Sequence, residues 1–108
     1  MNYSISRTNE FSKHLKQLAK KYPSIQKDYE ELLASLSENP LQGSSLGKNC
    51  YKLRWKISSK QTGKSGGARV ITYVKIENKH ITLPDVYDKA DKESISEKEL
   101  AILIKKAG

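Results

Sequence analysis

The spacing of apolar residues changes once along the chain, from a helical period to a strand period. Between Phe11 and Leu36 apolar side chains recur every three or four positions, which is the repeat of an amphipathic helix. Pro23 divides this stretch, because proline disfavours helical dihedrals in the preceding residue and cannot donate a helical hydrogen bond. We therefore expect two helices, and their short connection makes them an antiparallel hairpin.

The second of these helices divides into an apolar stripe and a polar face. Ser24 directly precedes it and is predicted to cap its first turn. The apolar stripe consists of Ile25, Tyr29, Leu32, Leu33 and Leu36. The opposite face carries Lys27, Asp28, Glu30 and Glu31. We expect the stripe to pack against the rest of the protein and the charged residues to face solvent.

After the helices the apolar period falls to two, which predicts strands. The polar stretch 58–67 between two such strands is short enough to make them antiparallel neighbours. The stretch 38–47, rich in Gly, Ser, Asn and Pro, is predicted to be a loop. The expected strands are residues 3–7, 51–58, 69–76 and 80–87.

A short helix is predicted near the end of the chain. Ser96 and Glu99 have the spacing of a capping box, and Leu100, Leu103 and Ile104 follow. The expected order is strand, helix, helix, strand, strand, strand, helix. This order predicts a single α+β domain over residues 1–108, with an N-terminal strand, an antiparallel helical hairpin packed on a small antiparallel sheet, and a short C-terminal helix.

Cysteine usage and hydropathy restrict the environment of the protein. The one cysteine, Cys50, cannot close an intramolecular disulfide, which indicates a reducing compartment. No apolar run approaches the roughly 20 residues of a membrane span, and the first residues lack the apolar segment of a signal peptide. We therefore expect a cytoplasmic protein with no membrane partner. Single His14 and His80 beside one cysteine predict no metal site, and no cofactor is implied.

The positive charge of the chain is concentrated in one window. The formal net charge is +8 over 108 residues. Residues 39–76 contain eight Lys and Arg and no Asp or Glu, whereas the rest holds 12 basic and 12 acidic side chains. The whole excess therefore lies between these positions. Such a concentration favours polyanions, because binding phosphates releases counterions.

The alternation within residues 51–58 places cations on one side of a strand. Lys52, Arg54 and Lys56 point one way, opposite Leu53 and Trp55. Trp55 is therefore assigned to the core rather than to base stacking. Three cations on one strand face form a surface suited to a phosphate backbone.

Four segments, taken with the order of elements, resemble a known family. They are LKQLAKKYPSIQKDYEELLASLSENPLQG, YKLRWKI, GGARVITYV and VYDKAD. Together they resemble the RelE/ParE superfamily of bacterial type II toxins, and the RelE/HigB-like members in particular, over nearly the entire chain. RelE-like members are ribosome-dependent mRNA endonucleases, whereas ParE-like members inhibit DNA gyrase.

The resemblance implies a function and its partners. The first expectation is an mRNA interferase, a metal-independent endoribonuclease that blocks translation by cutting ribosome-bound mRNA. The alternatives are a gyrase inhibitor and a basic nucleic-acid-binding module of the same fold without activity. For a toxin the resemblance also implies a cognate antitoxin protein whose acidic or amphipathic segment covers the basic face.

The chemistry of RNA cleavage assigns roles to the basic residues. Attack by a 2′-hydroxyl needs a group that takes its proton, a group that protonates the leaving oxygen, and cations that stabilise the phosphate in the transition state. The planar guanidinium of arginine binds two phosphate oxygens at once. We therefore assign transition-state stabilisation to Arg69, which the resemblance also favours, and phosphate anchoring to Arg54. Lys52 and Lys56 are both candidates for the base, because neighbouring cations favour the neutral amine.

The remaining candidates complete the predicted site. Tyr87 resembles a tyrosine near the C-terminus of related nucleases, where it stacks on a base or orients the nucleophile. In some relatives a histidine or a glutamate transfers protons in the corresponding strands, and other residues occupy those places here, so the base stays unassigned. The acidic residues 85, 88, 91 and 93 are expected to form a solvated edge. Predicted contacts to RNA are made by Lys60, Lys64, Tyr73 and Lys75.

Overall fold

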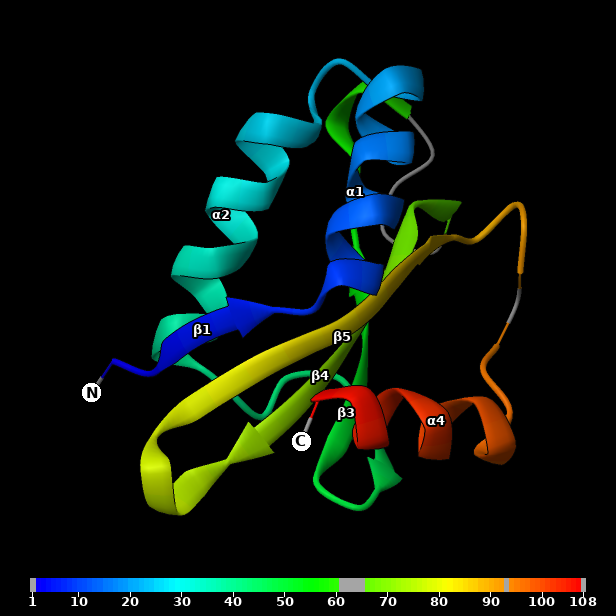
Figure 1. Ribbon diagram of the computed structural model, residues 1–108. Coiled ribbons are helices and arrows are strands. Elements are labelled where there is room, and N and C mark those ends of the chain that lie inside the picture. Colours follow the sequence, from blue (N-terminus) through cyan, green and yellow to red (C-terminus); the bar gives the residue numbers. More distant parts are fainter. Residues whose placement is uncertain (1, 61–65, 93, 108) are drawn as a thin grey trace.

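One sheet runs through the part of the chain that the structure describes, residues 2–60, 66–92 and 94–107 of a computed structural model (Figure 1). Five strands form it in the order β1-β5-β4-β3-β2. All neighbours are antiparallel except β1 and β5, which run parallel. Two parallel strands must be joined by a crossover connection, and the helical hairpin that follows β1 is part of the connection from β1 to β5. The strands are β1 Ser4–Arg7, β2 Ser44–Gly47, β3 Cys50–Trp55, β4 Ala68–Lys75 and β5 His80–Asp88.

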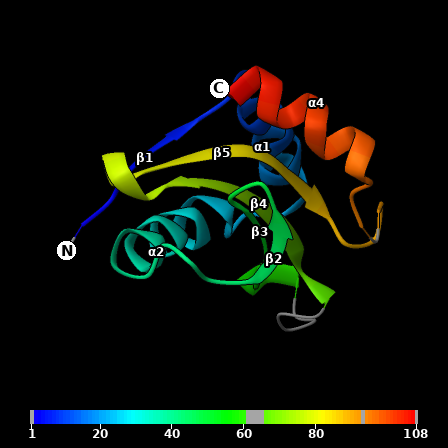
Figure 2. The ribbon, with the colours of Figure 1, turned by 90° about the horizontal axis from the view of Figure 1, so that it is seen from below.

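Helices cover both faces of this sheet. The hairpin of α1 (Asn9–Lys21) and α2 (Ile25–Glu38) packs on one face, and α4 (Glu97–Ala107) lies on the other (Figure 2). Single 3₁₀ turns follow β3 (η1, Ser58–Lys60) and β4 (η2, Ile76–Asn78). The α+β class, the N-terminal strand, the hairpin and the C-terminal helix are therefore confirmed. No helix in the described part of the chain is both long and apolar enough to cross a membrane.

Local capping explains where two of the helices begin. The Thr8 hydroxyl accepts a hydrogen bond from the backbone N–H of Phe11 at 3.1 Å and caps α1. The predicted capping box opens α4: the N–H of Glu99 donates to the Ser96 hydroxyl at 3.1 Å, and the N–H of Ser96 donates to the Glu99 carboxylate at 3.2 Å. Proline at position 23 ends the first helical stretch as expected.

The polar face of α2 differs from its prediction at Asp28, which is buried. The Ser24 hydroxyl makes no capping bond to the backbone and donates instead to this carboxylate at 2.6 Å. The backbone N–H and the hydroxyl of Ser58 also donate to it, at 2.9 and 2.7 Å. Burial alone would raise the pKa of Asp28, but these bonds outweigh it and hold the pKa below its usual value. Asp28 therefore ties α2 to η1 rather than facing solvent.

The predicted loop over residues 38–47 contains a strand, β2, which sequence periodicity missed. β2 pairs with the first residues of β3 and leaves the rest of that edge open. Gly43 precedes it with φ +94°, and a Cβ there would lie 2.4 Å from the carbonyl oxygen of Lys52. This position therefore requires glycine for its dihedral and for its close approach to β3.

Two apolar clusters lie on the two sides of the sheet. The larger, between the sheet and the helical hairpin, includes Trp55, whose side chain is 5% exposed and whose indole N–H donates to the Asp28 carbonyl. The prediction that Trp55 belongs to the core is confirmed. The smaller cluster lies under α4 and consists of Cys50, Ile71, Tyr87 and Leu100. The cationic side chains of the central strands therefore emerge on the α4 side.

Candidate active site

Two arginines and a tyrosine form one row across the three central strands. Arg54 of β3 lies directly opposite Arg69 of β4, and Arg69 lies directly opposite Tyr87 of β5. Residues opposite each other in a sheet project from the same face. The three candidates that the sequence placed far apart, at positions 54, 69 and 87, are therefore brought together.

An irregularity at Pro84 turns Tyr87 toward this row. In β5, Ile81 and Leu83 point to the helical hairpin, and strict alternation would send Tyr87 the same way. The register between β4 and β5 shifts between Ile71 and Tyr73, where β5 has one extra residue. Proline cannot donate to a ladder, and such bulges redirect the side chains that follow them. Tyr87 consequently lies in the cluster under α4.

Arg69 and Tyr87 are buried polar groups. Arg69 is 5% exposed, and its Nη1 donates to the Ala68 carbonyl at 3.1 Å. Tyr87 is 8% exposed, and its hydroxyl is buried with no hydrogen-bond partner among the described residues. Burial raises the pKa of Tyr87, and the positive charge of Arg69 acts in the opposite direction. The ammonium of Lys92 lies 5.2 Å from the centre of the tyrosine ring.

The other predicted cations occupy different places around the row. Lys52 is half-buried and lies directly opposite Ile71. It is two residues before Arg54 on β3 and therefore on the same face of the sheet. Arg54 and Lys56 are exposed, and Lys56 follows the end of β3. These residues surround the Arg54–Arg69 pair with positive charge.

Tyr73 and Lys75 belong to the far end of β4. The Lys75 ammonium lies 5.6 Å from the centre of the Tyr73 ring. Tyr73 lies four positions beyond Arg69 on β4, which corresponds to about 13 Å along the strand. One phosphate cannot contact both residues. Lys64 lies outside the described residues.

Lys60 is held inside an ion pair rather than on the basic face. Its ammonium donates to the Asp88 carboxylate at 2.5 Å and to the Gly67 carbonyl at 3.3 Å. Tyr22 donates to the other carboxylate oxygen at 2.8 Å. Burial alone would raise the pKa of Asp88, but the hydrogen bonds outweigh it and lower the pKa to about 2. Lys60 thus neutralises an internal carboxylate, and we remove it from the predicted RNA contacts.

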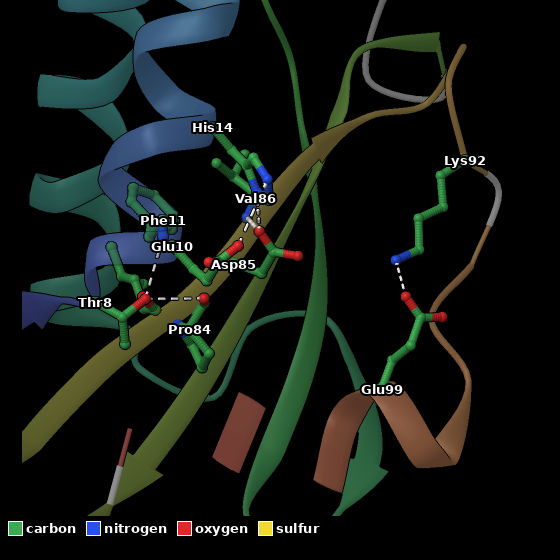
Figure 3. A network of polar contacts seen from close by, with 10 residues as sticks. Thr8, Glu10, Phe11, His14, Pro84, Asp85, Val86, Lys92 and Glu99 are labelled. Carbon is green, nitrogen blue, oxygen red and sulfur yellow. Dashed lines mark hydrogen bonds and ion pairs between the residues drawn. The ribbon is translucent and has the colours of Figure 1, made fainter. Parts of the chain in front are cut away.

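The acidic edge was predicted at residues 85, 88, 91 and 93, and among the first three, which the structure describes, only Asp91 is solvated. Glu93 lies outside the described residues. Asp85 and Asp88 are 6% and 2% exposed. Asp85 accepts a hydrogen bond from Nδ1 of His14 on α1 at 2.5 Å and from the N–H of Val86 at 2.9 Å (Figure 3). Sequence reasoning missed this pair because its members are 71 positions apart. Within the described part of the chain, no group of three or more His, Cys, Asp or Glu is placed to hold a metal ion.

Solved structures of other proteins share this fold, although no sequence comparison finds a match. No known family model matches the chain, and no curated protein sequence matches it significantly. A free arginine-to-alanine double mutant of the E. coli toxin RelE superimposes with a TM-score of 0.61 at 16% identity, over 99% of this chain and 95% of that one. The chain has the RelE toxin fold.

Two further solved structures share this RelE fold. The isolated E. coli RelE toxin matches with a TM-score of 0.60 at 17% identity, over 95% of this chain and 97% of that one. A chain of the toxin–antitoxin complex RelBE2 from Mycobacterium tuberculosis matches with a TM-score of 0.64 at 19% identity, over 84% and 95%. At these identities the likeness establishes the fold, and the chemistry has to be argued from the residues of this chain.

Proposed function

We propose that this chain, as a single domain, is the toxin of a bacterial type II toxin–antitoxin pair and cleaves messenger RNA on the ribosome. The observation that carries the proposal is the cross-strand pair of Arg54 and Arg69 beside Tyr87. A phosphate placed between the two guanidinium groups gains charge-assisted hydrogen bonds from both. The fold shared with RelE toxins supports the same function.

The proposed reaction is an internal transfer at one RNA phosphate. The 2′-oxygen forms a bond to phosphorus while the bond from phosphorus to the 5′-oxygen breaks, which leaves a 2′,3′-cyclic phosphate and a 5′-hydroxyl. Arg69, held rigidly inside the sheet, stabilises the charge that develops on the phosphate oxygens. Arg54 anchors the same or the adjacent phosphate, and Tyr87 orients the nucleotide. Lys52 and Lys56 extend the positive surface along the RNA.

A protein partner follows from the same proposal. One of the structural neighbours is a toxin–antitoxin complex. We propose that this chain also binds an antitoxin, and that acidic side chains of the antitoxin cover the row around Arg54. Binding of the antitoxin to this basic face would block access of RNA and so inhibit the toxin.

The experiment that tests the function is in vitro translation of a defined mRNA followed by primer extension. Wild type should introduce cuts that are missing when ribosomes are omitted. Arg69→Lys keeps the charge but loses the two-pronged contact, and should cut about 10²-fold more slowly. Arg7→Ala is the control, because Arg7 is the one arginine of the sequence outside the proposed site. It is exposed on β1, the edge strand that β5 and β4 separate from β3.

The contrary outcome has a defined meaning. Intact mRNA with a folded wild-type protein would overturn the nuclease proposal. The same protein should then be added to DNA gyrase, since inhibition of supercoiling would indicate a gyrase-directed toxin of the same fold. If the protein neither inhibits supercoiling by gyrase nor cleaves ribosome-bound mRNA, the remaining interpretation is a nucleic-acid-binding module without activity.

A further inference from the structure

The cleft beside Tyr87 contains a histidine–carboxylate pair that has no role in the phosphate site proposed above. His14 of α1 and Asp85 of β5 are joined between Nδ1 and Oδ1 at 2.5 Å (Figure 3). A carboxylate of this kind accepts hydrogen bonds, so the proton between the two groups is carried by Nδ1. In the neutral ring the lone pair then lies on Nε2, which is free to take a proton from another group.

The second nitrogen of His14 is accessible. The side chain is 32% exposed, and Nε2 lies 3.7 Å from the Glu10 carboxylate, beyond hydrogen-bonding distance. Asp85 is 6% exposed and is also held by the N–H of Val86. One end of the imidazole is therefore fixed by β5, the other end makes no hydrogen bond to a described residue, and the side chain lines the cleft.

His80, the other histidine of the chain, provides a contrast. The ring nitrogens of His80 lie 2.7 Å from the Ser4 hydroxyl and 2.8 Å from the Ser6 hydroxyl. Both nitrogens are occupied, at the edge where β1 joins β5. His80 has a structural role in this arrangement, and His14 is the histidine with a nitrogen available for chemistry.

The cleft that holds this pair shares Tyr87 with the proposed phosphate site, whereas Arg54 and Arg69 are not among its lining residues. It has a volume of about 350 Å³ and lies between α1, the end of β5 and the segment that follows β5. Asp85 and Tyr87 are two residues apart on β5, after the bulge, so they project from the same face. Arg69 is directly opposite Tyr87. Side chains lining the cleft include His14, Gln17, Lys21, Asp85, Tyr87 and Lys92.

We propose that this cleft receives the nucleotide on the 5′ side of the scissile phosphate, and that His14 is the base that takes its 2′ proton. The inference rests on the proposed function and supplies the proton acceptor that it lacks. The 2′-hydroxyl gives its proton to Nε2 of His14 as the 2′-oxygen bonds to phosphorus. The 5′-oxygen leaves with a proton from an ammonium of the cleft, Lys21 or Lys92, and both groups re-equilibrate with solvent.

Histidine suits this step better than the lysines of β3. A lysine must lose a proton before it can act as a base, whereas a neutral imidazole is already a base near neutral pH. Asp85 acts as a positioning residue, because its carboxylate fixes the tautomer and stabilises the imidazolium that forms. The charged groups that face His14 are Glu10 on α1, Asp85 on β5, and the cleft residues Lys21, Asp88, Asp91 and Lys92.

The test is the single-turnover rate of cleavage of ribosome-bound mRNA between pH 5.5 and 8.5. His14→Gln should slow cleavage about 10²-fold or more and remove the fall in rate at acidic pH that a histidine base causes. His80→Gln is the matched control and should keep the rate and the pH profile of wild type. Asp85→Asn should slow cleavage, since the ring loses the carboxylate that accepts from Nδ1 and fixes its orientation.

Two further measurements separate catalysis from folding. Added imidazole should restore part of the rate of His14→Ala, which a structural defect would not allow. In wild type, NMR signals of the His14 ring should shift on titration with a 2′-O-methylated dinucleotide, and those of His80 should not. Equal rates for His14→Gln and His80→Gln, or unshifted His14 signals, would overturn the inference. A wild type that never cuts mRNA refutes the proposed function itself.

Discussion

Replacing Asp88 by asparagine should remove the ion pair that holds Lys60 away from the basic face. The Asp88 side chain is 1% exposed, and its carboxylate accepts hydrogen bonds from Lys60 at 2.5 Å, Tyr22 at 2.8 Å and the N–H of Ala90 at 2.9 Å. Asparagine keeps the shape but not the charge. The ammonium of Lys60, with only 13% of its side chain exposed, then loses its counter-charge.

The depressed pKa of Asp88 sets the magnitude. Its pKa falls from 3.8 to about 2, which corresponds to about 2.5 kcal/mol of stabilisation by the ionised form. Because the folded-state pKa lies below the unfolded one, this stabilisation is complete above about pH 4 to 5 and disappears as the pH falls toward 2. Asp88→Asn should therefore lower the free energy of unfolding by about 2.5 kcal/mol at pH 7 and by much less near pH 2.

Urea denaturation of both proteins at pH 7, 4 and 2.5 measures this difference. Asp91→Asn, which removes a carboxylate from an exposed position nearby, should change the free energy of unfolding by less than about 0.5 kcal/mol at every pH. A difference between wild type and Asp88→Asn that is the same at pH 7 and pH 2.5 would refute the reasoning. So would a loss no larger than that of the control.

Three smaller tests concern other parts of the fold. Gly43→Ala, with φ +94° and a carbonyl oxygen 2.4 Å from the new Cβ, should destabilise by about 1–3 kcal/mol in urea, and more than Gly47→Ala, which meets open space at φ +80°. Asp28→Ala removes a buried carboxylate that accepts two part-buried hydrogen bonds from Ser58 and should cost about 1–3 kcal/mol in the same assay, whereas a smaller loss would show that these bonds contribute little to stability. Burial raises the pKa of the Cys50 thiol to about 11, so iodoacetamide at pH 8 should label the native protein about 100-fold more slowly than the urea-unfolded chain, and equal rates would contradict its burial.

The order of elements and the cationic strand face could be predicted from local pattern alone. Helical and strand periods differ, proline ends a helix, and the capping box of α4 lies within four consecutive residues. Alternation also placed Lys52 and Arg54 on one face and Trp55 on the other, as the structure confirms. These features depend on neighbours in sequence, which is why the sequence suffices for them.

The parts that were missed depend on contacts distant in sequence. β2 has four residues, Ser and Gly among them, and only its pairing with β3 makes it a strand. Asp28, Asp85 and Asp88 resemble solvated acids in the sequence because each has a decisive partner 28 to 71 positions away. Pro84 was the available signal for the bulge that turns Tyr87, since proline inside a strand marks an irregularity. The direction of the turn required the register with β4.

The central claim is that Arg54 and Arg69 act together on a phosphate of ribosome-bound mRNA. Its most direct test is the single-turnover cleavage rate of wild type, Arg54→Ala, Arg69→Lys and the double variant, each checked for folding by thermal denaturation. We expect each single change to slow cleavage about 10²-fold, and the double variant to lose clearly less than the product of the two. Rates that stay at the wild-type value in both folded single variants would contradict the account.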